Sequence, residues 1–367
     1  MVFHKLVLDS VNRAVTTLDG MAGKSVNVAK VLKALGERPI AVGFAGGERG
    51  KELRTLLAAL GIEEGFVEVA APTRQCTTVI DESAGTHTEL VEESKPVTTI
   101  EYEKLMAFVQ RHINRCRAVI MSGSIAPGCP ADLYCRCGRL ASAVEALSIV
   151  DAQGAALLEA LAAKPGLVKP NRSELAATVG HPLMDEAAVM SAMRELHERG
   201  AQRVVVTAGT GQVLSFDGKS FWRVVPPKVA ALNPIGSGDS FTAALVWRLL
   251  RGEDLGEACR WAAAAGAANA LTLMPGELER AEVERLVSGV KVQSGVETRR
   301  PNSEGRKKAE FRIPNDPGAG GRLALPRVTI WPSDFRLACL TAVSRRCLFD
   351  GPGRVEVTVE EPPDFSA

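Results

Sequence analysis

Apolar and polar positions alternate in blocks from about residue 22 to residue 290 of this 367-residue chain. Two stretches, 28–35 and 53–60, carry apolar residues at the spacing i, i+3, i+4, i+7 and end at a glycine, which predicts amphipathic helices. Short apolar runs predict strands at Pro39–Phe44, Ala118–Met121, Ser148–Asp151, Leu167–Lys169 and Arg203–Thr207. Such strands, alternating with helices, are typical of a parallel sheet buried on both faces in a doubly wound α/β fold.

Two regions depart from this alternation. Residues 67–94 contain two strand-like runs, Cys76–Asp81 and His87–Val91, which predict a small sheet projecting from the body as a lid. Residues 291–367 are polar or rich in proline and glycine, which predicts a poorly ordered C-terminal extension. The sequence therefore indicates one α/β domain over 1–290, followed by this extension.

Composition narrows the classes of protein that fit the chain. Lys and Arg total 44 against 43 for Asp and Glu, so a formal net charge of +1 gives no general attraction to nucleic acid or an anionic membrane. Aromatic residues, at 5%, are too few for a nucleic-acid stacking platform. The sequence shows no apolar run of about 18 residues and no secretory signal. Its eight cysteines lack paired spacing, so we expect a cytoplasmic protein with free thiols.

The strongest local motif is Asn233–Phe241, a glycine-rich turn that leads into a helical stripe. Gly236 and Gly238, with Ser237 between them, allow a tight turn and a close approach of the backbone to a ligand. The helix start presents N–H groups and the positive end of the macrodipole, which suit a phosphoryl group in transfer. Asp239 in the first turn is a candidate base for an attacking hydroxyl, or else only caps the helix.

This motif resembles the signature of the PfkB-type, ribokinase-like carbohydrate kinases, in the form of the 1-phosphofructokinase and tagatose-6-phosphate kinase branch. Further motifs follow the family's order at about its spacing: Val11–Arg13, Ala22–Val28, Thr73–Cys76, Ser122–Ser124, Asp151–Gly154, Lys169–Glu174 and Ala267–Leu271. The resemblance spans residue 1 to about 290. It implies a three-layer sandwich around a mainly parallel sheet, with a small β-lid from strands near 3–16 and 67–94.

The resemblance implies a sugar site at the start of the first helix. Gly23 and Asn27 would hold the sugar there, and Lys24 would reach a phosphate. Arg74 would grip a phosphate that the sugar already carries, because its planar fork pairs bidentately with phosphate oxygens. Arg13 is assigned to substrate binding by the same resemblance.

The resemblance also implies bound ATP and Mg²⁺. Asn171 and Glu174 would organise the nucleotide phosphates and the metal, with Glu174 acting directly or through water. Carboxylate and amide oxygens suit Mg²⁺, but the same pair also fits a helix capping box. Both roles are compatible with one geometry.

Two further segments are candidates for nucleotide contacts. Thr207, Gly209 and Gly211 would form the nucleotide-phosphate loop, or else an ordinary turn. A later alanine-rich helix with Gly266 and Asn269 would line the adenine pocket, although close helix packing also selects small residues. Both interpretations stay open in each segment, and Gly209 is the position that the resemblance supports best.

One family feature has no counterpart in this sequence. The family's opening strand ends in Asn-Pro-x-x-Asp and supplies a sugar ligand, and neither Asp9 nor Asp19 occupies that place. We therefore expect the sheet to lack one central strand. This departure leaves open a catalytically impaired chain.

The sequence thus predicts an ATP-dependent kinase for a ketohexose phosphate: fructose 1-phosphate, tagatose 6-phosphate or fructose 6-phosphate. One alternative is a kinase for an unphosphorylated sugar or a nucleoside. Another is a non-catalytic binder of sugar phosphate or nucleotide. The resemblance also implies a homodimer through the β-lid, and we expect no nucleic-acid or membrane partner.

Overall fold

The computed structural model describes residues 1–295 and 339–344. Its helices are α1 Lys24–Ala34, α2 Gly47–Ala59, α3 Thr99–His112, α4 Leu133–Ala143, α5 Gly154–Ala160, α6 Arg172–Val179, α7 Glu186–Glu198, α8 Ser237–Leu249, α9 Leu255–Ala270 and α10 Arg280–Val287. Its strands are β1 Val2–Phe3, β2 Pro39–Ala45, β3 Glu63–Glu68, β4 Cys76–Asp81, β5 Thr86–Val91, β6 Cys116–Ser122, β7 Leu147–Asp151, β8 Leu167–Val168, β9 Val204–Val206, β10 Val213–Phe216, β11 Phe221–Val225, β12 Lys291–Ser294 and β13 Cys339–Ser344.

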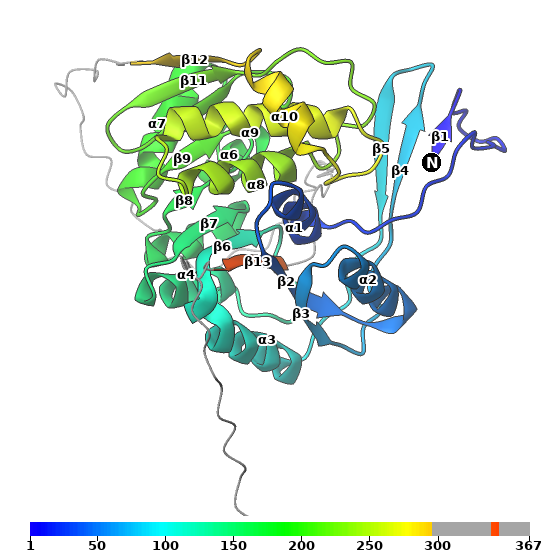
Figure 1. Ribbon diagram of the computed structural model, residues 1–367, viewed down its shortest axis with the longest axis horizontal. Helices are drawn as coiled ribbons and strands as arrows, with labels where there is room; N and C mark the ends of the chain where they lie inside the picture. The colour runs from blue at the N-terminus through cyan, green and yellow to red at the C-terminus, as the bar shows by residue number, and fades with distance from the viewer. Residues whose placement is uncertain (296–338, 345–367) are drawn as a thin grey trace, which may run out of the picture.

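A large mixed sheet forms the centre of the molecule (Figure 1), with the order β12-β11-β10-β9-β8-β7-β6-β13-β2-β3. Strands β6, β7, β8 and β9 pair in parallel with one another in that order, and β2 pairs in parallel with β3. Because β2 and β6 are both antiparallel to β13, these two parallel sets run in the same direction. The five strands expected from apolar runs appear as β2, β6, β7, β8 and β9, so the predicted parallel sheet is confirmed.

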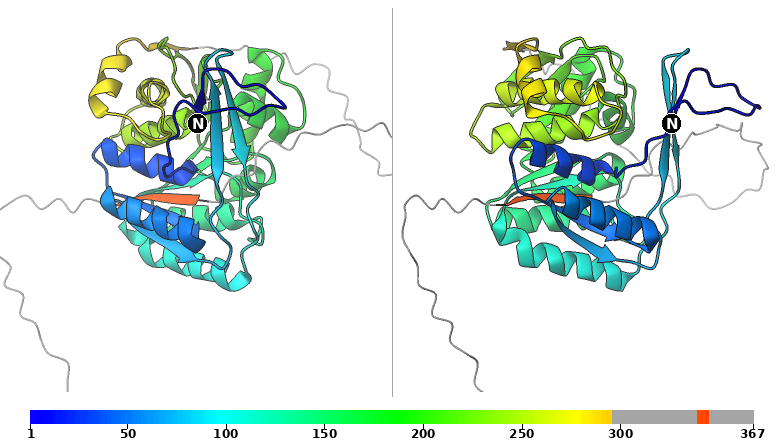
Figure 2. Two further views of the ribbon diagram at one scale, coloured as in Figure 1. Left: turned by 90° about the vertical axis from the view of Figure 1, so that its right-hand side faces the viewer. Right: turned by 45° about the vertical axis from the view of Figure 1, so that its right-hand side comes forward.

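Helices cover both faces of this sheet (Figures 1 and 2). In β6, Ala118 and Ile120 pack among residues of α1, α8, α9 and α10, whereas Val119 and Met121 pack among residues of α3 to α7. Successive strand side chains point to opposite faces, so a strand that is apolar on both sides needs a helical layer on each side. The predicted three-layer sandwich follows from this double burial.

A second sheet, in the order β1-β4-β5, projects from the body as the predicted lid (Figure 2). Strands β4 and β5 pair antiparallel over their full length, and β1 adds in parallel to β4. The N-terminal part has less strand than the sequence predicts. Only β1 and an isolated bridge between Val2 and Thr16 form, because the segment between them turns back at Asp9, whose φ is 56°.

The expectation of a missing strand is wrong at the position between β2 and β6. Strand β13 lies between β2 and β6, so the sheet has no empty position there, although a missing central strand was expected. This strand and β12 both come from the stretch 291–367 that the sequence assigned to an extension. The other residues of that stretch, to which the prediction of poor order applies, lie outside the described residues.

Leu32 offers a test of the core between α1 and α8. Its side chain is fully buried, so Leu32→Ala should lower the free energy of unfolding by about 2–5 kcal/mol through lost burial and a residual cavity. Leu60→Ala is the matched control, because this leucine is 46% exposed at the end of α2 and its loss should cost less than about 0.5 kcal/mol. Urea denaturation of both variants measures the difference, and equal losses would contradict this packing.

Candidate active site

The start of α8 has the backbone that the glycine-rich motif predicts. Gly236 is in the left-handed region with φ 85°, and a Cβ there would lie 2.7 Å from Cβ of Pro275. Only glycine fits that position without strain or collision. No side chain caps the helix, and a Cβ on Gly238 would meet no atom within 4 Å. The N-terminal end of α8 therefore faces open space. A phosphoryl group needs such space to reach the free N–H groups of the helix.

Asp239 and Asn27 form a buried pair beside this turn. The Nδ2 group of Asn27, in α1, donates a 2.7 Å hydrogen bond to Oδ2 of Asp239. Asp239 is 7% exposed and Asn27 is 4% exposed. The buried Oδ1 atom of Asn27 has no hydrogen-bond partner, and a buried acceptor of this kind is costly unless a ligand satisfies it. The structure thus brings a predicted catalytic residue and a predicted sugar-binding residue together.

Asn27 is placed by the helix start before it. Gly23 precedes α1 with φ 126°, a conformation that favours glycine, and its carbonyl accepts a 2.9 Å hydrogen bond from the Asn27 amide. On the other side, a Cβ on Gly276 would lie 2.7 Å from Cα of Asn27. The loop that contains Gly276 therefore packs directly against the backbone of Asn27.

Asn269, predicted to line the adenine pocket, is completely buried behind the glycine turn. Its Oδ1 accepts hydrogen bonds from the Gly276 amide at 2.7 Å and from the Ser240 hydroxyl at 3.1 Å. Its Nδ2 donates to the carbonyl of Ile235 at 2.9 Å. These contacts tie the turn before α8 to α9 and to the loop after it, which is a shaping role.

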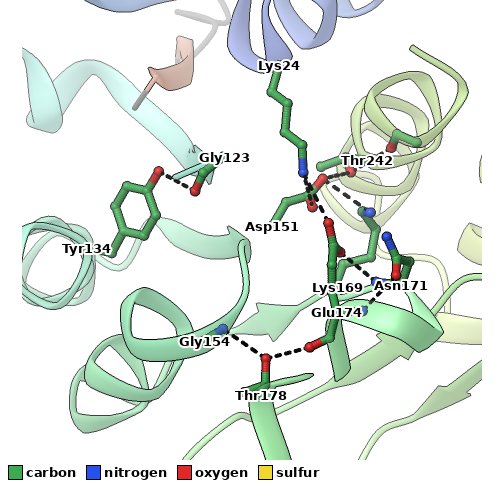
Figure 3. A network of polar contacts seen from close by, with 11 residues as sticks. Lys24, Gly123, Tyr134, Asp151, Gly154, Lys169, Asn171, Glu174, Thr178 and Thr242 are labelled. Carbon is green, nitrogen blue, oxygen red and sulfur yellow. Dashed lines mark hydrogen bonds and ion pairs between the residues drawn. The ribbon is translucent and has the colours of Figure 1, made fainter. Parts of the chain in front are cut away.

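A network of charged groups lies next to the start of α8 (Figure 3). Asp151, at the end of β7, accepts a 2.8 Å hydrogen bond from the Thr242 hydroxyl of α8. Its carboxylate lies 3.2 Å from Nζ of Lys169 and 3.4 Å from Nζ of Lys24. Lys24 also lies 3.8 Å from Oε1 of Glu174. Two ammonium groups and two carboxylates thus balance one another.

The network controls the ionisation of Asp151. Its side chain is 1% exposed, and this burial alone would raise its pKa. The ammonium groups of Lys169 and Lys24 and the Thr242 hydrogen bond outweigh the burial, and they lower the pKa of Asp151 to about 2. Asp151 is therefore a fixed negative charge at neutral pH.

Asn171 and Glu174 form a capping box, which is one of the two roles that the sequence suggested for this pair. The other suggested role was metal binding. The Asn171 side chain accepts from the Glu174 amide, and the Glu174 side chain accepts from the Asn171 amide, each at 2.8 Å. Oε1 of Glu174 faces Lys24 instead. Within the described residues, no group of three or more His, Cys, Asp or Glu is arranged to hold a metal ion. A Mg²⁺ ion that keeps most of its water fits this site better than one caged by protein ligands.

The predicted nucleotide-phosphate loop follows β9. Thr207 forms an isolated bridge with Asn171, which connects this loop to the start of α6. Gly209, with φ 58°, and Gly211 lie in an exposed turn closed by a 2.8 Å hydrogen bond from the Gly211 amide to the Ala208 carbonyl. The turn is therefore open to solvent beside the charged network.

Two further residues predicted to bind substrate, Arg74 and Arg13, belong to the lid root and to the N-terminal segment. Arg74 is at the root of the lid, where Nη1 donates to the Glu92 carbonyl at 3.4 Å. Arg13 is exposed in the segment before α1.

No role was predicted for Asp151, Lys169 or Thr242. The first two stand at or just after the carboxyl ends of predicted strands, where parallel sheets place their functional groups, and this position was the available signal. Thr242 gave no signal, because its contact with Asp151 joins α8 to β7 across 91 residues of sequence.

The structure also describes the helices and cysteines that bear on membrane insertion and on disulfide formation. Within the described segments, no helix is both long and apolar enough to cross a bilayer. The cysteines placed by the structure are free thiols, as predicted: Cys76, Cys116, Cys129, Cys135, Cys137 and Cys259.

A ribokinase-like sandwich with a lid, and a buried carboxylate at an uncapped helix start, define a class of phosphotransferases that act on alcohol groups. Comparison with known families identifies the class more closely. The pfkB family carbohydrate kinase pattern matches residues 3–277, and the chain belongs to this family of carbohydrate kinases.

Individual proteins support this assignment. Tagatose-6-phosphate kinase of Staphylococcus epidermidis is 28% identical over 288 residues, which cover 78% of this chain and 92% of that protein. The tetrameric inhibited form of phosphofructokinase-2 from Escherichia coli superposes with a TM-score of 0.68 at 28% identity, covering 78% of this chain and 93% of that one. A structure named as a possible 1-phosphofructokinase from Thermotoga maritima has a TM-score of 0.70 at 21% identity, covering 80% and 96%, and supports the fold alone.

The lowered pKa of Asp151 makes stability depend on pH in acid. The unfolded carboxyl, near its ordinary pKa of 3.8, takes up a proton before the folded one, so the stabilisation is present above about pH 4 and is lost as the pH falls towards about 2. The stability difference between the wild type and Asp151→Asn should therefore shrink by about 1 kcal/mol between about pH 6 and about pH 3. Urea denaturation at both pH values measures it. A difference that does not change with pH would contradict the charged network.

Proposed function

We propose that this carbohydrate kinase transfers the γ-phosphoryl group of ATP to a free hydroxyl of a ketohexose phosphate, with Asp239 as the catalytic base. The observation that carries the proposal is the buried Asp239–Asn27 pair at the uncapped start of α8. The hydrogen bond from Asn27 holds the Asp239 carboxylate in place at the helix start, where it would accept a proton. The unpartnered Oδ1 of Asn27 is suited to accept a hydrogen bond from a sugar hydroxyl.

In the proposed reaction, the substrate oxygen attacks the γ-phosphorus while the bond from that phosphorus to the bridging oxygen of ADP breaks. The proton of the attacking hydroxyl passes to the Asp239 carboxylate. The backbone amides over Gly236–Asp239 and the positive end of the α8 macrodipole stabilise charge on the phosphoryl oxygens in transfer. Positioning and electrostatics supply most of the rate, as in phosphoryl transfer generally.

The charged network suits the phosphates of a nucleotide. Asp151 and Glu174 are balanced by Lys24 and Lys169, so incoming phosphate charge requires further cations. Mg²⁺, when bound, would neutralise part of that charge, and Glu174 would hold it through water with its Oε1 side. The Lys24 side chain is 10% exposed. The nucleotide phosphates would compete with Asp151 for the Lys24 ammonium group, and Lys24 would turn towards them.

The substrate class rests on the relatives and on Arg74. The similar proteins include a tagatose-6-phosphate kinase and phosphofructokinases, so fructose 1-phosphate, tagatose 6-phosphate and fructose 6-phosphate are the candidate substrates. Arg74, at the lid root, would bind the phosphate that the sugar already carries. Arg13, exposed in the segment before α1, would contribute to binding the substrate.

A homodimer through the lid is part of this proposal. The lid exposes large apolar side chains on β5 and on the segment before α1: Val7, Leu8, Val11, Val15, Leu90 and Val91. Exposed apolar residues gathered on one projecting element are typical of an interaction surface. The similar phosphofructokinase-2 from Escherichia coli is tetrameric in its inhibited form.

Asp239→Asn tests the base directly. ADP release with Mg·ATP and each of the three sugar phosphates should fall by about 10²–10⁴ in this variant, because the amide cannot accept the proton. Asp254→Asn is the matched control, since Asp254 caps α9 at the end opposite to Asn269 and asparagine caps as well, so turnover should stay at the wild-type value. Wild-type turnover that survives in Asp239→Asn would overturn the assignment. A folded wild type that binds ligand without turnover would favour the non-catalytic binder.

Arg74→Ala tests the substrate class. Loss of a charge-assisted contact to the sugar's phosphate should raise KM for the sugar phosphate about tenfold to a hundredfold and leave ADP release with an unphosphorylated sugar unchanged. Arg49→Ala is the control, because Arg49 also lies at the lid root and bonds Thr73 and Glu92. Equal effects of the two variants would assign Arg74 to holding the lid. No effect of Arg74→Ala would favour a kinase for unphosphorylated substrates.

A further inference from the structure

Strand β13 occupies an unusual place in the sheet. It is separated from β12 by residues 295–338, yet it lies between β2 and β6, third from the β3 end of the strand order (Figure 1, in orange). It pairs with β6 from Cys339 opposite Ser122 onwards and with β2 from Leu340 opposite Val42. Both pairings are antiparallel, so the strand is hydrogen-bonded along both edges.

Strands β2 and β6 flank β13 and form the two walls of a slot in the sheet. Strands β2 and β6 run in the same direction with one strand between them, so they lie about 10 Å apart, twice the usual spacing of about 4.8 Å. Every residue of β2 is buried, and only Arg117 of β6 is not. Without a strand in the slot, the facing N–H and C=O groups of both walls would lack partners inside the molecule, which is costly.

The sequence of β13 suits this slot. Residues 339–344 read Cys-Leu-Thr-Ala-Val-Ser, which contains no charge, proline or glycine and includes two β-branched residues. Arginine follows directly at 345 and 346. A short uncharged run bounded by charge is the pattern of a strand that is covered on both faces.

We propose that the slot between β2 and β6 is a binding site for one extended strand, and that its occupant is residues 339–344 of the same chain. The occupant is held by backbone pairing to both walls and not by continuity with either neighbour. Residues 295–338 are long enough to reach the slot, because the distance from β12 is about 35 Å and an extended chain covers about 3.3 Å per residue.

Occupancy of the slot bears on the active site through α1 and β6. Helix α1, which carries Lys24 and Asn27, packs against β13. Strand β6 ends at Ser122, whose partner in β7 is Asp151. A vacant slot would therefore remove support from the helix that holds Asn27 against Asp239.

Hydrogen exchange of the full chain tests the proposal. Thr341→Pro removes a ladder donor in the middle of β13 and cannot fit a central strand, so amides in 39–45 and 116–122 should exchange at least about a hundredfold faster. Thr341→Val is the matched control, because it keeps the N–H group and the strand preference, and its exchange should equal that of the wild type. Unchanged protection of both walls in Thr341→Pro would overturn the proposal. Protection in the wild type that falls on dilution would also overturn it, by identifying a second copy's strand as the occupant.

A cleavage experiment covers the case in which Thr341→Pro fails to fold. A protease site is introduced between residues 300 and 330 of the full chain, and the folded protein is then cut. The C-terminal fragment should co-elute with the body in size-exclusion chromatography and separate only in denaturant. Immediate separation of the fragments under native conditions would overturn the proposal. Neither readout depends on catalysis, so both outcomes are independent of the proposed reaction.

Discussion

A carboxylate inside a protein has to be compensated, and the compensation of Asp151 determines how the working parts of this kinase meet. Its partners come from different elements: Lys24 from the start of α1, Lys169 from the end of β8 and Thr242 from α8. Loss of any one would leave buried charge or an unpaired polar group, which costs far more than an exposed ion pair contributes. The carboxylate therefore fixes both helices of the site relative to the carboxyl edge of the sheet.

Around this point the structure separates rigid parts from accessible ones. The turn before α8 is held by Gly236, where a side chain would collide with Pro275, and by the amide of Asn269, whose contacts are all within the protein. The exposed turn at Gly209 and the lid root at Arg74 are outside that framework. A kinase has to hold its reacting groups still while substrates enter and products leave, and this division of the molecule serves both needs.

The sequence predicted the parts of this protein that depend on local pattern. Apolar runs located five strands of the sheet, and the glycines at 236 and 238 located the helix start, because strand burial and tight turns leave a direct mark on residue type. Asn27 and Asp239 were predicted as separate site residues, but their contact was not, since 212 positions separate the two residues and no local rule joins them. Thr242 was missed for the same reason, because a threonine in a helix has no pattern until its partner is known. The position of β13 was unpredictable, since strand pairing over more than 200 residues leaves only a short apolar run in the sequence.

The location of β13 also determines the order in which the molecule can be completed during synthesis. Ribosomes deliver a chain from its N-terminus at about 5–20 residues per second, so β2 and β6 emerge long before the strand that joins them. For that interval the nascent sheet consists of two separate halves, each with an open edge that is able to pair with any extended chain nearby. Closure between strands so distant in sequence is slow as well. The edges of β2 and β6 therefore stay open to incorrect pairing until residues 339–344 have left the ribosome.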